Sequence, residues 1–372
     1  MDKLTFCCPC HFGLESVLKF EIGKIGGENI AATDGKVCFS GDLSLLVRAN
    51  LWLRTAERVL IVMDQFRAES FEELFQGVKS ICWEEFIGKS DAFPVKSGSS
   101  INSKLASIPD CQSIIKKAIA ERLKDKYGVS WLEETDAVHT VRFAVFKDVV
   151  SVYLDTSGDG LHKRGYRRRS NEAPIKETLA AGIVDLARVR ADSIVCDPMC
   201  GSGTFLIESA YKATSIPSGI RRRFAAEKWG SIPQNIWKAE REAALAGINK
   251  SSKFRAHGAD IDPVCADLSL DNAKRAGVAS RIRVENADIS RFKPEKGAIT
   301  ICNPPYGERL LEIRQAEELY KKMGQTLHPD KDDPCYIISP HEDFEKFFGK
   351  KADKQRNLYN GMIKCRLFMY YK

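Results

Sequence analysis

The sequence predicts an α/β protein in which a mixed α+β region precedes a C-terminal parallel sheet wound by helices. From residue 193 onward, short apolar runs alternate with helical patterns, which is typical of parallel strands connected by helices. The turn Gly201-Ser202-Gly203 joins one of these strands directly to a helix, an arrangement that is common at ligand sites of such sheets. The N-terminal part lacks this regular alternation and carries no catalytic signature.

The N-terminal α+β region, residues 1–156, is predicted from its apolar periodicity. Strands are expected at residues 4–8, 36–39, 59–64, 93–96, 138–146 and 149–155. Helices are expected at residues 14–24, 43–50, 71–82 and 111–127. Gly88-Lys89-Ser90 resembles the end of a phosphate-binding loop, but the first glycine of that motif would fall at Trp83, so this interpretation fails.

The C-terminal region is predicted to alternate strands and helices. Helices are expected at residues 174–188, with Pro174 in the first turn, and at 204–213, 263–276 and 313–327. Strands are expected at 193–196, 254–259, 282–285, 298–302, 335–339 and 361–371, the last of them a terminal strand or half of a hairpin. Residues 215–257 separate two of these strands, and we interpret them as an insertion beside the site.

Basic residues are concentrated in two segments. Residues 1–160 carry 19 Lys and Arg against 23 Asp and Glu, whereas residues 161–372 carry 38 against 27. The excess lies in residues 161–171 and 215–257. A solvated basic face is the simpler explanation, but clustered cations favour a polyanion, since its bound counterions are released. Phosphate contacts are predicted for Lys163, Arg164, Arg167, Arg168, Arg221, Arg222 and Arg223.

Composition excludes several classes of protein. No apolar run approaches the ~20 residues of a membrane span, and the start lacks the pattern of a secretory signal, so we expect a cytoplasmic protein without a membrane contact. The twelve cysteines are scattered and are expected to be reduced. Cys7 and Cys10 form one C-x-x-C without a second ligand pair, so no metal site is predicted.

The first motif is Asp197-Pro198-Met199-Cys200-Gly201-Ser202-Gly203-Thr204. Glycines at a strand–helix joint let the backbone approach a ligand closely. Leu206 occupies the third glycine position of the dinucleotide fingerprint, whereas an acid at the strand end suits the cationic amino group of S-adenosylmethionine. An ordinary strand–turn–helix joint is the alternative. Cofactor contacts are predicted for Asp197, Pro198, Cys200, Gly201, Ser202, Gly203 and Thr204.

Acids follow the next two strands. Asp260 ends the second strand of the site and is predicted to bind ribose hydroxyls, with Asp262 as second choice. Ile261 is placed to pack on the adenine face. Asp288 follows the next strand and is predicted to accept a hydrogen bond from the adenine amino group, although an Asp in this position is more often a turn former.

The fourth motif, Asn303-Pro304-Pro305-Tyr306, predicts the reaction. An aromatic amine is a poor nucleophile because its lone pair is delocalised into the ring. The Asn303 side-chain oxygen and the Pro304 carbonyl can accept both amino hydrogens, while Tyr306 stacks on the extracted base. Positioning and hydrogen bonding by these groups carry most of the reaction because the methyl donor is already activated. The predicted catalytic residues are Asn303, Pro304, Pro305 and Tyr306.

These paired motifs resemble those of class I methyltransferases of the N6-adenine/N2-guanine type. The run His162-Lys163-Arg164-Gly165-Tyr166-Arg167 is similar to bacterial enzymes that make N2-methylguanine in large-subunit (23S) ribosomal RNA. The resemblance implies a ferredoxin-like domain at residues 1–60 and a THUMP RNA-binding domain at 61–156. A basic linker at 157–172 and a seven-stranded, Rossmann-like methyltransferase domain at 173–372 would follow.

The resemblance also implies an enzyme that uses S-adenosylmethionine to methylate guanine N2 in 23S ribosomal RNA. RNA is the expected partner, and no obligate protein partner is expected. Three alternatives stay open at this point. They are a transfer RNA guanine-N2 methyltransferase, a DNA N6-adenine methyltransferase, and a noncatalytic RNA-binding or ribosome-assembly factor. Members of this family are often labelled DNA adenine methylases because the catalytic motif does not distinguish the two bases.

Overall fold

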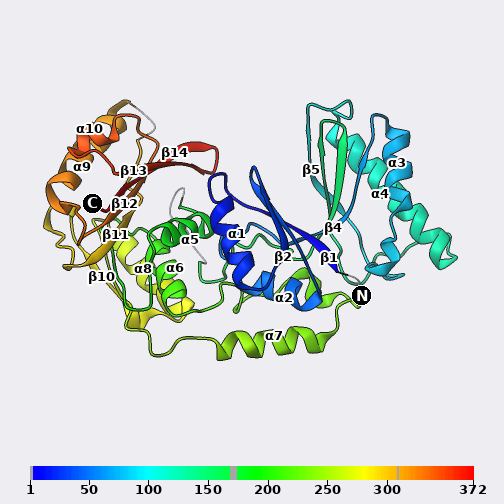
Figure 1. The fold of residues 1–372 in the computed structure, drawn as a ribbon, viewed down its shortest axis with the longest axis horizontal. Helices are drawn as coiled ribbons and strands as arrows, with labels where there is room; N and C mark the ends of the chain where they lie inside the picture. Colours follow the sequence, from blue (N-terminus) through cyan, green and yellow to red (C-terminus); the bar gives the residue numbers. More distant parts are fainter. Residues whose placement is uncertain (1–2, 168–173, 308–309) are drawn as a thin grey trace.

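The computed structural model describes residues 3–167, 174–307 and 310–372, and its strands form two seven-stranded sheets (Figure 1). The N-terminal sheet is built from β1 (Leu4–Pro9), β2 (Glu28–Thr33), β3 (Lys36–Gly41), β4 (Leu60–Arg67), β5 (Val95–Ile101), β6 (Val141–Phe146) and β7 (Val149–Asp155). Its helices are α1 (Glu15–Lys24), α2 (Leu43–Trp52), α3 (Phe71–Ser80) and α4 (Ile108–Tyr127).

The N-terminal sheet is continuous across the boundary predicted at residue 60. Its strand order is β2-β3-β1-β4-β7-β6-β5, and β1 pairs with β4. One buried cluster joins its core-facing strand residues to the helices. Strand β2 was not predicted because it is an edge strand whose residues are almost all exposed, so it has no apolar alternation. Cys7 and Cys10 belong to different buried clusters.

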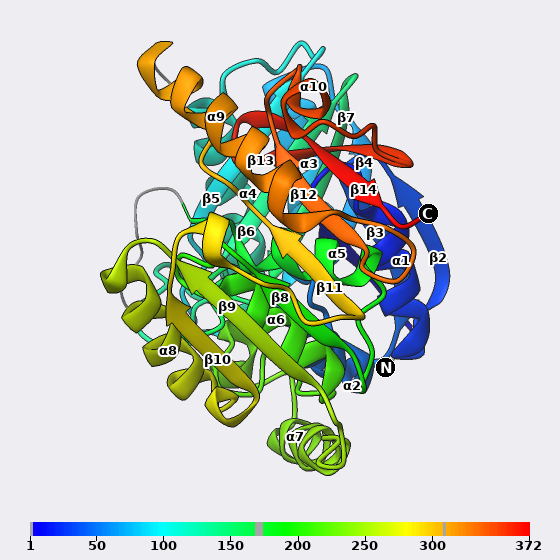
Figure 2. The same ribbon diagram turned by 90° about the vertical axis from the view of Figure 1, so that its left-hand side faces the viewer.

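The C-terminal domain has the seven-stranded sheet that the resemblance implied, in the order β10-β9-β8-β11-β12-β14-β13 (Figure 2). The sheet is mixed and not wholly parallel as the alternation predicted, because β14 runs antiparallel to β12 and β13. Its strands are β8 (Ile194–Asp197), β9 (Arg255–Asp260), β10 (Ile282–Asn286), β11 (Ala298–Cys302), β12 (Cys335–Ser339), β13 (Lys354–Asn360) and β14 (Ile363–Tyr370). Its helices are α5 (Glu177–Leu186), α6 (Thr204–Ala213), α7 (Gln234–Ala246), α8 (Pro263–Ala276), α9 (Leu310–Leu327) and α10 (Phe344–Phe348).

The sheet brings the site motifs together because its central strands are parallel. Strands β9, β8 and β11 are neighbours with the same direction, so their carboxyl ends meet at one edge, where ligands bind in such sheets. Buried clusters cover both faces, one with α5, α6 and α8 and the other with α9 and α10. The predicted start of the first helix was wrong, since α5 begins at Glu177 and Pro174 precedes it.

The sequence suggested that residues 215–257 form an insertion beside the site, and this prediction was wrong. Helix α7 lies along α2 of the N-terminal region (Figure 1), where Arg48 Nη2 and Glu240 Oε1 are 2.6 Å apart. Trp229 and Trp237 are buried in the N-terminal core. The segment therefore packs against the N-terminal region. Its tryptophans bury apolar area there, which the count of charged residues could not predict.

None of the helices in the described ranges is long and apolar enough to cross a bilayer.

Candidate active site

A cavity of about 690 Å³ opens at the carboxyl ends of β8, β9 and β11. Its walls include all four predicted catalytic residues and nine of the ten predicted cofactor residues. These are Asp197, Pro198, Cys200, Gly201, Ser202, Thr204, Asp260, Ile261, Asp288, Asn303, Pro304, Pro305 and Tyr306. The exception, Gly203, lies immediately behind the wall, at the start of α6. The volume lies within the ~300–1,000 Å³ range of ligand pockets.

The glycine turn between β8 and α6 is held from behind by α8. Gly203 has a φ of +78°, and a Cβ there would lie 2.3 Å from Ser269 Oγ, so a side chain meets both strain and a clash. Buried Asn272 of α8 donates from Nδ2 to the carbonyl of Ser202 at 3.0 Å. Asn272 was not predicted as a site residue, because it supports the turn from another helix and sequence spacing gives no sign of this.

Two acids flank the turn in different environments. Asp197 is buried, and burial raises the pKa of its carboxyl well above the usual range, with a smaller raising effect of Asp260. Asp260 Oδ2 accepts a hydrogen bond from the Gly201 amide at 2.8 Å, and its Oδ1 accepts one from the Asp262 amide at 3.0 Å. Asp260 therefore joins the two loops that form this end of the cavity. Asp262, the second choice for ribose, instead caps α8.

The wall beyond β9 combines the exposed side chain of Ile261 with the half-buried Asp288. Ile261 is 68% exposed, which leaves its side chain open to contact with a planar ring. Asn286 Nδ2 fixes this loop by donating to the carbonyls of Asp260 and Ile261, both at 2.9 Å. Asp288 Oδ1 accepts hydrogen bonds from the Ser290 amide and hydroxyl, and this hydroxyl bond lowers the pKa of Asp288. Asp288 is therefore ionised and fixed in place at neutral pH.

The Asn303 side chain is held by Tyr306 of the same turn, and residues of β13 and α9 support this turn. The Tyr306 hydroxyl donates to Asn303 Oδ1, and Asn360 Nδ2 donates to the Tyr306 hydroxyl at 3.4 Å. Tyr320 of α9 donates to the Pro305 carbonyl at 3.1 Å, which holds the Pro-Pro turn. Tyr306 lines the cavity, and its stacking on a base stays a prediction.

The β13–β14 hairpin closes the cavity on the side of Tyr306, and the sequence analysis did not include it in the site. Asn360, Gly361 and Ile363 line the cavity, and Met362 at the tip is 97% exposed. Gly361 has a φ of +63° at the first position of a two-residue loop, where hairpins favour glycine. Gly361 itself, the residue type that such loops favour at their first position, was the signal that could have located this turn.

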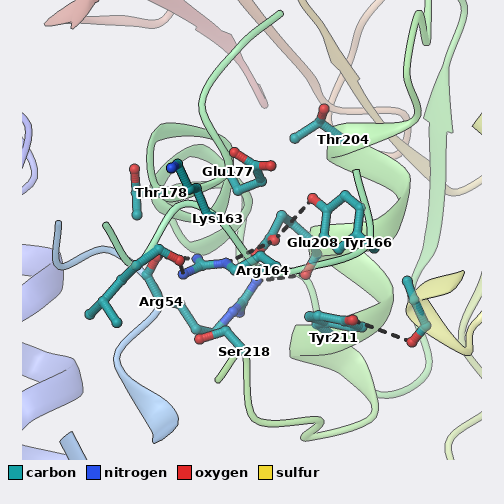
Figure 3. Close-up of polar contacts among 12 residues, drawn as sticks. Arg54, Lys163, Arg164, Tyr166, Glu177, Thr178, Thr204, Glu208, Tyr211 and Ser218 are labelled. Atoms are coloured by element: carbon teal, nitrogen blue, oxygen red, sulfur yellow. Dashed lines mark hydrogen bonds and ion pairs between the residues drawn. The ribbon is translucent and has the colours of Figure 1, made fainter. Parts of the chain in front are cut away.

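In the basic linker, Arg164 is buried, and its guanidinium lies between Glu208 and Arg54 instead of facing RNA (Figure 3). The Arg164 side chain is almost fully buried, and it donates from Nε to Glu208 Oε1 at 3.3 Å. It also donates to the carbonyl of Leu161 at 2.6 Å and to that of Arg54. The predicted phosphate contact of Arg164 was therefore wrong. This arginine joins the N-terminal region to helix α6, which begins at the glycine turn.

Arg222 was also wrongly assigned to phosphate binding. Its guanidinium is buried and donates to four carbonyls, including those of Asp159 at 2.6 Å and Gly160 at 2.7 Å. Arg167 is turned towards the cofactor turn, where it donates to Thr204 Oγ1 at 2.5 Å and lies 3.4 Å from the carboxylate of Glu177. The buried guanidinium groups of Arg164 and Arg222 replace the hydration lost on burial with hydrogen bonds to protein acceptors, which offsets the cost of burying a charge.

Four predicted phosphate ligands remain, and the structure describes three of them. Lys163, Arg221 and Arg223 are exposed, so phosphate contacts by these three stay predictions. Arg168 lies outside the described residues.

Comparison with known proteins establishes the family. The model of an "RMKL-like, methyltransferase domain" matches residues 164–368, preceded by an "RlmL ferredoxin-like domain" at 5–60 and a THUMP domain at 68–155. The chain belongs to the RMKL-like methyltransferase family. The family assignment agrees with the glycine turn and the Asn-Pro-Pro-Tyr turn, which meet in one cavity.

Three relatives show how far the likeness extends. The protein named "Putative RNA methyltransferase YpsC" of Bacillus subtilis is 40% identical over all of this chain and 97% of its own length. "Ribosomal RNA large subunit methyltransferase K/L" of Methylococcus capsulatus is 33% identical over 96% of this chain, which spans 50% of that relative. The structure of SMU.472, described as a putative methyltransferase complexed with SAH, has a TM-score of 0.94 at 36% identity, with 100% of this chain and 98% of SMU.472 covered.

The RMKL-like chain is an S-adenosylmethionine-dependent RNA methyltransferase. The cavity fits this cofactor in its own right. Gly201 of the turn lines the cavity, a buried acid ends β8, and a second acid ends β9. These acceptor groups suit a ligand with a cationic amino group, a ribose and an adenine.

Proposed function

We propose that this enzyme methylates the exocyclic N2 amino group of a guanine in 23S ribosomal RNA, in the cytoplasm. The observation that carries the proposal is that Asn303 and Tyr306 lie in the same cavity as the glycine turn. The THUMP match at residues 68–155 supports RNA as substrate. The relatives named for large-subunit ribosomal RNA support the RNA class, although the chain spans only about half of their length.

Asn303 is proposed to hold the target amino group. A carbonyl oxygen has two lone pairs, and the Tyr306 hydroxyl uses one of them on Asn303 Oδ1. The second can accept a hydrogen from the target amine, which favours a tetrahedral nitrogen and aims its lone pair at the reacting carbon. Bound S-adenosylmethionine supplies an activated methyl group on a sulfonium. The protein's part is therefore orientation and exclusion of water, both of which lower the entropic barrier.

The cofactor contacts are proposed as the sequence assigned them. Asp197 would pair with the cationic amino group, Asp260 would accept hydrogen bonds from ribose, and Asp288 would accept one from the adenine amino group. Ile261 would pack on the adenine face. The glycine turn would approach the methionyl part, with Arg167 holding Thr204 at the start of α6.

Asp197→Asn is expected to weaken S-adenosylmethionine binding roughly 10- to 100-fold, the worth of a hydrogen bond to a charged group. The raised pKa of Asp197 also predicts a pH dependence. The neutral carboxyl persists to higher pH than usual, and only the ionised form pairs with an ammonium, so affinity should rise with pH as the proton leaves. Calorimetric titration between pH 5 and 8 should show that the affinity for S-adenosylmethionine rises with pH in the wild type. The variant should not show this rise. Equal affinity and slope would contradict the role.

Met362→Ala is expected to lower turnover roughly tenfold on structured RNA, because extruding a base costs a few kcal/mol and an apolar side chain can fill the vacated stack. Met362 is suited to this by its exposure at the hairpin tip beside the cavity. Single-turnover rates on a folded fragment and on an unstructured oligonucleotide would be compared. Met362→Leu serves as control and should stay active. An equal loss on both RNAs would rule out the wedge.

The substrate class is tested by incubating the enzyme with labelled S-adenosylmethionine and three nucleic acids in parallel. These are large-subunit ribosomal RNA from cells lacking the gene, transfer RNA from the same cells, and duplex DNA. Label in ribosomal RNA alone is the expected result. Label in transfer RNA or in DNA would contradict the proposed substrate class, whereas the assignments of the fold and of the cofactor would stand. No label with any substrate, despite cofactor binding, would favour a noncatalytic factor.

A further inference from the structure

A second cavity of about 830 Å³ lies between helix α1 and the methyltransferase sheet, and neither the proposed chemistry nor the predicted phosphate contacts use it. Ile299 and Tyr336, near the amino ends of β11 and β12, form part of its wall. Asn303 follows the opposite end of β11, roughly 13 Å further along at ~3.3 Å per residue. The cavity therefore faces away from the active site.

The walls of this cavity carry an excess of positive charge. Five cationic side chains come from three separate segments of the chain. They are Arg188, Arg190, Lys331, Lys354 and Arg356. Within the described residues, none of the five forms an ion pair with a carboxylate within 4.0 Å. In the part of the chain that the structure describes, Arg356 makes one side-chain hydrogen bond, to the Ser16 hydroxyl at 3.1 Å. Among the described residues that line the cavity, Asp185 is the one acid, and it is paired with Lys212.

Nearby acids are engaged by the backbone instead of by these cations. Asp330 Oδ1 accepts hydrogen bonds from the amides of the two residues that follow Lys331, at 2.8 and 2.9 Å. Asp333 Oδ1 accepts one from the Gly297 amide at 2.7 Å. Asp353 Oδ2 accepts two from the amides at the end of β14, at 2.6 and 2.9 Å. Because like charges gathered without partners cost free energy, the five cations point to an anionic ligand.

The remaining wall has aromatic and apolar character. Phe20 of α1 is 59% exposed, Tyr371 is half-buried, and Met369 and Ile299 are also in the wall. Cations that bind phosphates beside rings that stack on bases are the combination that proteins use for single-stranded nucleic acid. An acidic protein would need the cations but not the exposed ring.

We propose that this cavity binds the phosphodiester backbone of the substrate RNA at a point remote from the target nucleotide. The proposal rests on RNA being the substrate and not on which base is methylated. Because the cavity and the active site open at opposite ends of the sheet, only an RNA long enough to pass around the domain can occupy both. The cavity would then recognise RNA in its larger folded context and add affinity without taking part in methyl transfer.

The test compares Arg188→Gln/Lys354→Gln with the control Arg275→Gln/Lys293→Gln, which removes the same charges from exposed residues elsewhere. The RNA class that proves to be methylated would be used in two forms, a long folded fragment and a hairpin of about 20 nucleotides around the target. Each lost phosphate contact lowers the slope of log K against log salt by about 0.7. Two lost contacts predict a slope smaller by about 1.4 and, at ~0.1 M salt, roughly 25-fold weaker binding of the long RNA.

Binding of the hairpin, the cofactor affinity and the melting temperature should match the control. This pattern supports a remote RNA contact and is independent of which nucleoside is methylated. Equal binding of the long RNA by both double variants would overturn the proposal. An equal loss on the hairpin would also overturn it, since that would mean a general charge effect or a binding site for a single nucleotide.

Discussion

Asn303→Ala is expected to lower the rate of methyl transfer by a factor of roughly 10²–10³, as when one preorganised hydrogen-bonding group is removed from an active site. The variant leaves the target amine without its side-chain acceptor but does not touch the glycine turn or the acids that flank it. Cofactor affinity should therefore stay within about twofold of the wild type. Single-turnover kinetics with saturating RNA and calorimetric titration of S-adenosylmethionine measure the two quantities.

Tyr306→Phe is the matched control for this variant. It removes the hydroxyl that donates to Asn303 Oδ1 and keeps the ring in place, so it should lose less activity than Asn303→Ala. Because Tyr306 would act through Asn303, the double variant should lose much less than the product of the two single losses. Wild-type turnover by Asn303→Ala would remove Asn303 from the mechanism.

Arg164→Met is expected to destabilise the protein by about 3 kcal/mol, because it leaves a buried carboxylate short of its partner. Arg164 and Glu208 are both nearly inaccessible to solvent, and their nearest charged atoms lie 3.3 Å apart. Arg54 remains 3.4 Å from the other oxygen of Glu208, which keeps the loss at the lower end of the range for broken buried pairs. Denaturant unfolding, followed by circular dichroism, measures the change.

Two further variants give this experiment its controls. Arg223→Met removes the same charge from a side chain that is 86% exposed and should change stability by less than about 0.5 kcal/mol. Adding Glu208→Gln to Arg164→Met removes the unpaired charge and should recover part of the loss. Equal stability of Arg164→Met and Arg223→Met would show that Arg164 does not stabilise the contact between the N-terminal region and helix α6.

The sequence predicted which residues of the C-terminal sheet converge on one cavity, because those residues lie at strand ends. In a parallel sheet, residues after neighbouring strands converge on one edge whatever the intervening segments do. Asp197, Asp260, Asp288 and Asn303 could thus be brought together from alternation alone, and they line one cavity. Gly203 was identifiable because a strand–glycine–helix joint requires a residue without a side chain.

The sequence could not predict which of the basic side chains are buried. Arg164 and Arg223 are the same residue type in similarly basic runs, yet one is buried against Glu208 and the other is exposed. Net charge is a property of the chain, whereas solvation depends on contacts between segments far apart in sequence. The same reason applies to α7, whose Trp237 packs into the N-terminal core, and to the cavity between α1 and the methyltransferase sheet, whose cations come from three segments.

The central claim is tested most directly by identifying the methylated nucleoside. Ribosomal RNA from cells lacking the gene would be incubated with the enzyme and isotopically labelled S-adenosylmethionine, digested to nucleosides, and analysed by mass spectrometry, with Asn303→Ala in parallel. The expected product is labelled N2-methylguanosine, formed by the wild type and nearly absent with the variant. Labelled N6-methyladenosine, or a label on any carbon or ring nitrogen, would contradict the proposed chemistry.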